Sequence, residues 1–447
     1  MKADSMITDR QANPLSGANA QAQALFDEGC EAFATYCGDP IALFDAAIEA
    51  APSCVMAHLA RAWCLTLATE PAAAQMAREG LSGIAGIAAR DERARGHYAA
   101  LGAALSGEWT TAARTLERHS LDHPRDLIAL QAGHLLDFLQ ADARTLRFRI
   151  ARALPHWEGV PGRSLLLGML AFGLEEAGAY PQAEEAGRAA IDGNPRDCWA
   201  HHAVAHVMEM QGRASDGVHW IESRAEHWAG EDNFLKTHNH WHLALCHIEL
   251  GAPECALALY DARIAGGVTA ADLVDQSALL WRLHLSGMDL TDRFAQVAGL
   301  WEAHADGALY PFNDVHAVMA WLGAGQMEKV AELRDRMRAA TGSQTARWIH
   351  ETGLPLIDGL TAFHQQRWDE AVDQLWPARH IVNRFGGSHA QRDVFELTLM
   401  EASLRGGHTR IAEGLARERL STRPHSPVNL AFANRARGRA QARAEAS

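Results

Sequence analysis

The chain has 447 residues, enough for roughly two or three ordinary domains or for one long array of repeats. A hydrophobic fraction of 48% and a charged fraction of 21% allow a sizeable core and exclude global disorder. The net charge of -14 argues against nucleic acid and anionic membranes as partners.

The cysteines and the apolar segments indicate the cellular setting. The seven cysteines are widely spaced and none forms a CxxC pair, which favours a reduced, cytoplasmic compartment. Residues 1–17 lack the apolar core of a signal peptide, and the most apolar stretch, residues 165–174, is too short to cross a bilayer. We therefore expect a cytoplasmic protein with no membrane segment.

Strand signals are nearly absent from the sequence. Ala, Leu, Glu and Arg dominate, and Gly or Pro interrupts them at regular intervals, which is typical of many short amphipathic helices. The interruptions repeat: "GEWTTA" (107–112) is followed by Pro124, and "GAYPQA" (178–183) is followed by Pro195. Gly, an aromatic residue, Ala and Pro occupy offsets 0, 2, 5 and 17 in both segments, and the segments start 71 residues apart, at Gly107 and Gly178.

Each offset has a physical role in a helical hairpin. Gly ends one helix in a tight turn, the aromatic residue opens the next helix, the small Ala lets two helices approach closely, and Pro closes the unit. Partial copies occur at "QRWDEA" (366–371) and "GHTRIA" (407–412). Gly212, Gly251 and Gly325 each follow an apolar segment and are expected to begin further hairpins.

These patterns predict an all-α fold in which TPR-like helical-hairpin repeats stack in a right-handed superhelix, an α-solenoid with a concave face. The spacing of the copies corresponds to about two units of a repeat of roughly 34 residues. We expect a flexible N-terminus (1–18), one continuous solenoid (19–434) and a flexible basic tail (435–447). Within the solenoid, the repeats are expected to be regular at about 95–265 and 355–430, with an irregular insert at about 265–312.

The first polar stretch is "WAHHAVAHVMEMQGR" (199–213). On a helix, His202, His206 and Glu209 share one face, and a histidine pair four residues apart can chelate a divalent ion with Glu as a third ligand or a base. The stretch lacks the Glu of an HExxH motif. The alternative is buried histidines that are satisfied by their neighbours.

The second polar stretch is "THNHWHLALCHIELG" (237–251). His238 and His242 share one helix face, whereas His240 and His247 share a nearly opposite face. The four histidines therefore cannot form one site on a single helix. At most half of this stretch is a candidate site.

The third polar stretch, "FNDVHAVMAWLGAG" (312–325), is expected to open a helix. Either Asn313 or Asp314 is expected to cap it, which leaves His316 and the other polar residue for a site.

The fourth polar stretch, "GGSHAQRDVFELTL" (386–399), has Ser388 as a natural cap. Gln391, Arg392 and Asp393 follow in the first turns. The Arg–Asp neighbours are a structural pair or, alternatively, provide a clamp for a carboxylate.

A further stretch, "ADLVDQSALLWRL" (271–283), adds Asp272 and Asp275, which are expected to be helix caps. Together with residues 272–283 of it, the four polar stretches resemble the tetratricopeptide repeat protein 38 family over most of the chain. The resemblance implies an all-helical TPR-like array and no established biochemical activity. His240 and His389 depart from the family pattern, where an aromatic residue and Asn are expected. The positions that match its polar motifs are His202, His206, Glu209, His238, Asn239, His242, Asn313, Asp314, His316, Gln391, Arg392 and Asp393.

We expect these twelve residues to converge on one polar pocket in the concave face, which binds a small polar ligand or a protein partner. One alternative is an enzyme that uses His206, His242, His316 and Asp393 for acid–base chemistry. The other is a divalent-metal site, with ligands drawn from His202, His206, His238 and His242. No cofactor is expected under the first hypothesis, and a homodimer is an alternative to a monomer.

Overall fold

The computed structural model describes residues 7–445, with side chains through residue 439. Helices make up almost all regular structure in this part of the chain, and the extended pairing within it is limited to two isolated bridges, Thr8 with Pro14 and Cys37 with Asn233. The all-α prediction is confirmed. None of the described helices is both long and apolar enough to cross a membrane.

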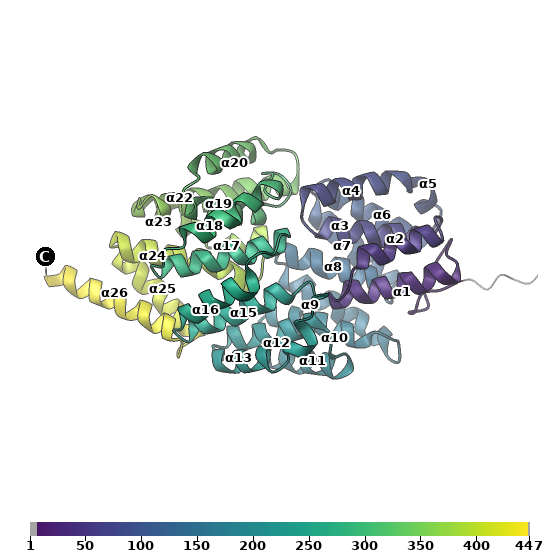
Figure 1. The fold of residues 1–447 in the computed structure, drawn as a ribbon, viewed down its shortest axis with the longest axis horizontal. Coiled ribbons are helices and arrows are strands. Elements are labelled where there is room, and N and C mark those ends of the chain that lie inside the picture. Colours follow the sequence, from purple (N-terminus) through teal and green to yellow (C-terminus); the bar gives the residue numbers. More distant parts are fainter. Residues whose placement is uncertain (1–6, 446–447) are drawn as a thin grey trace, which may run out of the picture. The chain divides into compact units, whose positions relative to one another are not determined.

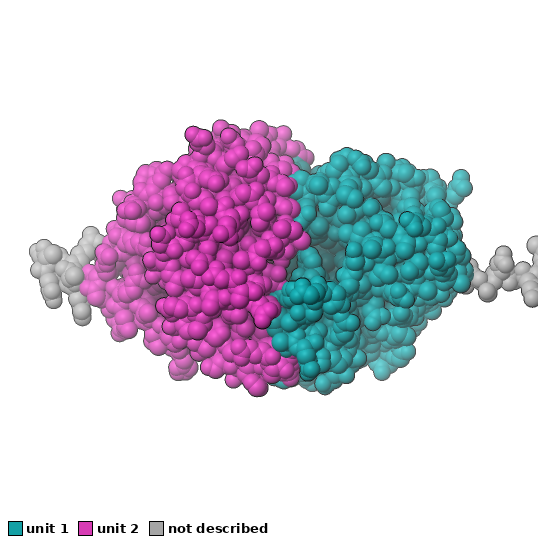
Figure 2. Space-filling model, viewed as in Figure 1, with its two compact units in different colours: residues 1–204, 225–236, 343–345 teal, residues 205–224, 237–342, 346–447 magenta. Residues whose placement is uncertain are grey.

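The chain divides into two compact units, coloured separately in Figure 2. Unit 1 comprises residues 1–204, 225–236 and 343–345, and unit 2 comprises residues 205–224, 237–342 and 346–447. Helices α12 (Cys198–Met210), α15 (Lys236–Glu249) and α21 (Gln344–Trp348) each begin in unit 1 and continue in unit 2.

The remaining helices of unit 1 follow one another in chain order, with α14 added from a later segment (Figure 1). They are α1 (Ala20–Thr35), α2 (Pro40–Ala50), α3 (Val55–Leu67), α4 (Pro71–Gly83), α5 (Ala85–Ala88), α6 (Glu92–Leu105), α7 (Trp109–Asp122), α8 (Leu127–Leu139), α9 (Ala143–Ala153), the 3-10 turn η1 (Leu154–Trp157), α10 (Arg163–Glu176), α11 (Tyr180–Gly193) and α14 (Ala225–Trp228).

Unit 2 contains the rest of the helices, including two π-helical turns, η2 and η4. They are α13 (Ala214–Glu222), α16 (Pro253–Leu259), η2 (Tyr260–Ile264), α17 (Ala270–Leu285), α18 (Thr291–Leu300), η3 (Trp301–Ala303), α19 (Pro311–Gly323), α20 (Met327–Ala339), η4 (Ile349–Gly353), α22 (Leu354–His364), α23 (Trp368–Ala378), η5 (Val382–Phe385), α24 (His389–Gly406), α25 (Thr409–Thr422) and α26 (Pro427–Glu445).

The helices pair as hairpins, as the repeat offsets predict. The most extensive contacts are between consecutive helices, including α6 with α7, α10 with α11, and α22 with α23. Trp109 and Tyr180 open α7 and α11, and the preceding glycines, Gly107 and Gly178, have φ values of 78° and 75°. A residue with a side chain is strained in this left-handed conformation, which explains the glycine at offset 0.

The small residue of each hairpin lies where two helices meet. Ala112 and Ala183 are fully buried, as is Ala371 in the partial copy. Gly212, Gly251 and Gly325 also have positive φ and precede α13, α16 and α20. Each of these glycines therefore lies in the predicted turn before a helix, and α19 packs against α20 across the turn at Gly325. Burial of the apolar face, rather than the turn residue, supplies most of the stabilisation of such short helices.

Residues 7–18 were predicted to belong to a flexible terminus, but they are packed into unit 1. Asp9 accepts hydrogen bonds from the backbone N–H and side chain of Asn13 and forms an ion pair of 2.9 Å with Arg93. Leu15 is buried. Sequence polarity suggested flexibility because it does not reveal a buried partner. Residues 1–6 of the predicted terminus lie outside the described residues.

The other predicted domain boundaries fall on helical segments. The insert expected at about 265–312 contains α17 and α18, and the tail expected at 435–447 continues α26 as far as Glu445. Residues 446 and 447 of that tail lie outside the described residues. The single continuous solenoid and the flexibility of the tail stay predictions.

Candidate functional site

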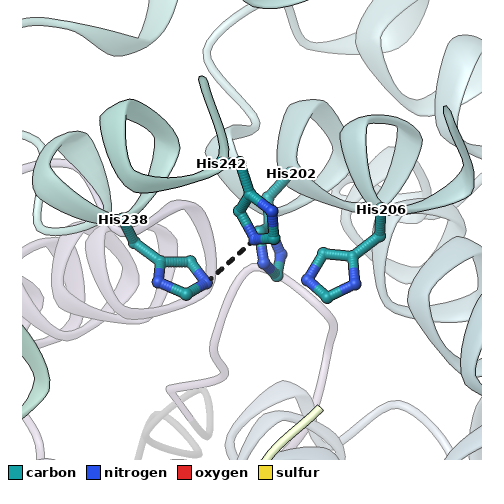
Figure 3. Close-up of side chains that lie close together, drawn as sticks. All are labelled: His202, His206, His238 and His242. Atoms are coloured by element: carbon teal, nitrogen blue, oxygen red, sulfur yellow. Dashed lines mark hydrogen bonds between the residues drawn. The ribbon is translucent and has the colours of Figure 1, made fainter. Parts of the chain in front are cut away.

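A cluster of three histidines occupies unit 2, and we name it the α12–α15 cluster: His206 from α12, and His238 and His242 from α15. One ring nitrogen of each histidine lies within 4.8 Å of those of the other two. His206 and His242 are almost fully buried, and His238 is partly exposed. Figure 3 draws these rings with His202, which lies one helical turn before His206 on α12.

Helix geometry explains this convergence. His238 and His242 are four residues apart on α15 and therefore neighbours on one face. Their ring centroids are 4.8 Å apart, and that of His206 lies 4.4 Å from that of His242. The indole of Trp241 stacks on His238 at 5.3 Å and is fully buried, so it fixes the orientation of that ring from behind.

Two carboxylates hold the outer nitrogens of the α15 histidines. His238 Nδ1 lies 2.8 and 2.9 Å from the two carboxylate oxygens of Asp275 on α17. His242 Nδ1 lies 2.9 Å from Oε2 of Glu209 on α12. The two Nε2 atoms then face each other at a distance of 3.2 Å, which Figure 3 marks with a dashed line.

This arrangement is a chain of three contacts: Asp275 to His238, His238 to His242, and His242 to Glu209. In each contact, two atoms that carry lone pairs face each other. Because lone pairs repel, a proton or a metal ion must lie between the two atoms. The outer two contacts are bridged by Nδ1 protons or carboxyl protons. The central contact between the two Nε2 atoms takes either a third proton or a metal ion.

Burial shapes the protonation of this cluster. Burial, and then the neighbouring His242, lowers the pKa of His206 well below its usual value. Burial, and then His238, does the same to the pKa of His242. Burial raises the pKa of Glu209 and of Asp275, and the nearby histidines oppose that rise. Neutral imidazoles are the form that binds metal ions.

A cavity of about 50 Å³ lies beside this cluster within unit 2 and is lined by Glu209, which contacts His242 Nδ1. Its charged lining residues come from five helices, α12, α15, α17, α24 and α25, and from the turn after α25. Asp393 on α24 binds both terminal nitrogens of Arg419, at 2.6 and 3.2 Å, and Arg423 lies 3.8 Å from the same carboxylate. The lining residues with ionisable acid or base groups are Glu209, Cys246, Glu249, Arg282, Asp393, Arg419 and Arg423.

The candidate residues of the third polar stretch, Asn313, Asp314 and His316, lie on α19 and are fully or nearly buried. His316 donates from Nδ1 to the carbonyl of Phe312 at 2.7 Å, and burial lowers its pKa to about 4. Asp314 accepts from the backbone N–H of Gly307 at 3.0 Å, and burial raises its pKa well above the usual value. Neither residue lines the cavity.

The capping prediction for Asn313 and Asp314 was wrong. Helix α19 begins at Pro311, with Tyr310 at the N-cap position. Proline is favoured in the first turn because it has no N–H to lose and its φ is already helical. Its presence moved the start of the helix ahead of the two polar residues.

The fourth stretch is divided between structural and cavity-lining roles. Ser388 caps α24 in a capping box with Gln391, as its sequence predicts. Arg392 donates to the carbonyl of Gly387 and contacts His389 Nδ1 at 3.3 Å. Of its candidate residues, Asp393 lines the cavity, as does the apolar Leu397 of the same stretch. The structure thus joins Glu209, the α12–α15 cluster and Asp393, but does not bring Arg392 and the α19 residues to that cavity.

Of the other histidines on α15, His240 and His247 are partly exposed and lie outside the cluster, and Asn239 is buried. Sequence reasoning treated Asp275 as a helix cap, but the cap of α17 is Thr269. It did not single out Arg282, Arg419 or Arg423. Asp275 and Arg282 are seven residues apart in an apolar helix, a spacing that places both on one face and could have indicated them.

Unit 1 buries a second set of histidines, the α6–α7 cluster, which consists of His97, His119 and Asp126. Nε2 of His97 and Nε2 of His119 lie 3.0 and 3.2 Å from the same oxygen of Asp126. Arg93 binds both oxygens of that carboxylate, at 2.7 and 3.1 Å. Trp63 donates to His97 Nδ1 at 2.9 Å, so the ring proton of His97 lies on Nε2 and points at Asp126.

No family model matches the chain. Among solved structures, that of the human IFIT1 dimer with m7Gppp-AAAA is similar to it, with a TM-score of 0.43 and 13% sequence identity. The similarity covers 95% of this chain and 96% of that chain. A similarity at this level transfers no ligand, partner or assembly to this protein.

Proposed function

We propose that this helical repeat protein binds a divalent transition-metal ion through His206, His238 and His242. The observation that supports the proposal is the orientation of the α15 histidines: each Nδ1 meets a carboxylate, and the two Nε2 atoms face each other at 3.2 Å. Carboxylates behind metal-binding histidines fix the tautomer and orient the ring. Two nitrogens at about 2.05 Å from a tetrahedral ion are separated by about 3.3 Å.

The donor set selects the kind of ion. Imidazole nitrogen suits zinc, copper, iron and nickel, whereas calcium and magnesium prefer oxygen ligands. Three histidines leave one position of a tetrahedral ion open for water or substrate. His202, one helical turn earlier on α12, belongs to unit 1 and is not part of this donor set.

Metal content measured by inductively coupled plasma mass spectrometry tests the proposal. The untagged protein should carry one ion per chain after equilibration with zinc and dialysis. The double variant His238→Ala, His242→Ala should carry none. The matched control is His240→Ala, His247→Ala, which removes two histidines from the same helix but lies outside the cluster. Equal metal content in both double variants, or none in the natural protein, would exclude the site.

A second candidate is acid–base catalysis without a metal, in which a proton occupies the central position of the chain from Asp275 to Glu209. The same three hydrogen-bond distances favour it. The two candidates differ in one observable. A metal-free protein whose His238 and His242 ring protons are seen by NMR in a shared Nε2 hydrogen bond would support catalysis, and stoichiometric zinc would support the metal site.

The finer expectations from the sequence remain part of this proposal. They are membership of the tetratricopeptide repeat protein 38 family, a small polar ligand or a protein partner, a cytoplasmic location, and a monomer or homodimer. The expectation that nucleic acid is not a partner rests on net charge alone. Light scattering of the purified protein, with and without zinc, would determine the oligomeric state.

A further inference from the structure

The cavity beside Glu209 contains a buried cation that lacks a direct counter-ion. Arg282 on α17 lines it and is 7% exposed. Its guanidinium donates to two backbone carbonyls, those of Ala278 at 3.2 Å and Ala390 at 2.6 Å. These bonds use two of the five N–H donors of a guanidinium. Among the described residues, no carboxylate forms an ion pair with Arg282 within 4.0 Å.

Arg419 lines the same cavity, and its buried guanidinium, unlike that of Arg282, has a carboxylate partner. Arg419 makes a two-pronged contact with Asp393 and donates from Nε to Asn429 at 2.8 Å. Asp393 is therefore already engaged, and Glu209 is engaged with His242. Arg282 is instead held over the indole of Trp241, with its Cζ atom 5.3 Å from the ring centroid. That contact keeps the cation in place without neutralising it.

The charge on Arg282 persists at neutral pH. Burial lowers its pKa to about 10, and the carboxylates of Asp393 and Glu209 oppose the change. Removing a cation from water without a paired anion is unfavourable, so a site of this kind favours an anion that enters with the ligand. The cavity has room for such a group, because a single water needs only about 10–15 Å³ of the same kind of space.

We propose that this cavity binds a small oxyanion group, a carboxylate or a phosphate, through Arg282 with Arg423 as the second contact. The planar fork of a guanidinium matches two oxygens of such a group. Because Glu209 lines the cavity and orients His242, the bound oxyanion lies next to the metal site. The inference rests on the proposed function for one point only, that this oxyanion belongs to the substrate of the metal site.

Binding of inorganic phosphate and of acetate to the metal-free protein, measured by isothermal titration calorimetry, tests the oxyanion site separately from the metal. Arg282→Gln should weaken binding of the better probe by about tenfold or more, since it removes a charge-assisted hydrogen bond. The matched control is Arg293→Gln on α18, where the arginine is partly exposed and paired with Asp261 at 2.7 and 2.8 Å. It should leave affinity unchanged within about twofold.

If Arg282→Gln fails to fold by circular dichroism, Arg423→Gln provides the second test. Arg423 lines the same cavity, and its only ion pair among the described residues is the contact of 3.8 Å with Asp393. This variant should weaken binding by at least about threefold. The inference is overturned if the natural protein binds neither probe at about 10 mM, or if the folded variants bind like the control. Zinc content of the same samples reports on the metal site, so either proposal can fail alone.

Discussion

Each unit buries histidines beside carboxylates, yet the two clusters present opposite ends of the imidazole to the acid. In unit 1, His97 and His119 direct Nε2 at Asp126, and Trp63 occupies Nδ1 of His97. In unit 2, Asp275 and Glu209 occupy Nδ1, and the Nε2 atoms of His238 and His242 face one another. The same residue types thus build a closed hydrogen-bond network in one unit and, in the other, the arrangement on which the proposed metal site rests.

The two clusters also differ in charge, because the carboxylate of the α6–α7 cluster is paired directly with an arginine. Asp126 also binds Arg93 and caps α8 through the N–H of Ala129. Although burial alone would raise it, these cationic and hydrogen-bonding partners hold the pKa of Asp126 well below its usual value. Every donor around Asp126 is directed at its carboxylate, so no lone pair is left for a metal ion. We infer that the α6–α7 cluster is structural.

The largest expected effect follows from breaking the unit 1 network. Asp126→Ala should destabilise unit 1 by about 3–5 kcal/mol, because it leaves the buried guanidinium of Arg93 without its principal anion. Hydrogen exchange of the α6–α8 backbone amides should become faster in the variant, whereas exchange in unit 2 should not change. The control Asp45→Ala removes an exposed partner of Arg61 in unit 1 and should change stability by less than about 1 kcal/mol. A loss as small as that of the control would contradict the structural assignment.

Much of this comparison was accessible from the sequence, and the reasons for the gaps are physical. The hairpins followed from Gly107, Trp109 and Ala112, because turn, helix start and close packing each demand a particular residue type. The grouping of His238 with His242 followed from helical periodicity.

What the sequence could not supply was pairing between helices distant in the chain. Asp275 looked like a cap because its partner, His238, lies 37 residues away. Arg392 looked like a clamp, but it bonds the carbonyl of Gly387. The α6–α7 cluster was missed entirely, because His97, His119 and Asp126 share no helix face or motif.

A second prediction compares the two kinds of carboxylate in unit 2. Asp275→Asn should weaken zinc binding by about 10–100-fold, because an amide orients His238 but makes its ring a weaker donor to the metal. Stability should change little, since the amide oxygen still accepts the Nδ1–H and a buried charge is removed. Competition with a chromophoric chelator measures the affinity. Asp272→Asn, three residues earlier on α17 and part of the capping box, is the control. Equal affinity in both variants would mean that Asp275 plays no part behind a ligand.

The smallest expected effect concerns Asp197, a buried carboxylate of unit 1. Unlike Asp126, which pairs with Arg93, it has no ion pair with an arginine among the described residues. Asp197 caps α12 through the N–H of Ala200 at 3.0 Å, and its other oxygen has no hydrogen-bond partner among the described residues. Burial raises its pKa to about 7. The folded state therefore retains a proton that the unfolded chain loses near pH 4, so the contribution to stability is present below pH 4 and is lost as pH rises to about 7.

Asp197→Asn should remove that pH dependence while keeping an acceptor for the cap. At pH 8 the variant should be more stable than the natural protein by about 1–2 kcal/mol, and at pH 4 the two should agree. Denaturant unfolding at both pH values measures the difference. A variant that is equally destabilised at both pH values would show that the Asp197 carboxylate has a partner that offsets its burial, as Arg93 offsets the burial of Asp126. In that case the two carboxylates, Asp197 and Asp126, would not differ in whether their charge is offset, and only the packing around them would distinguish them.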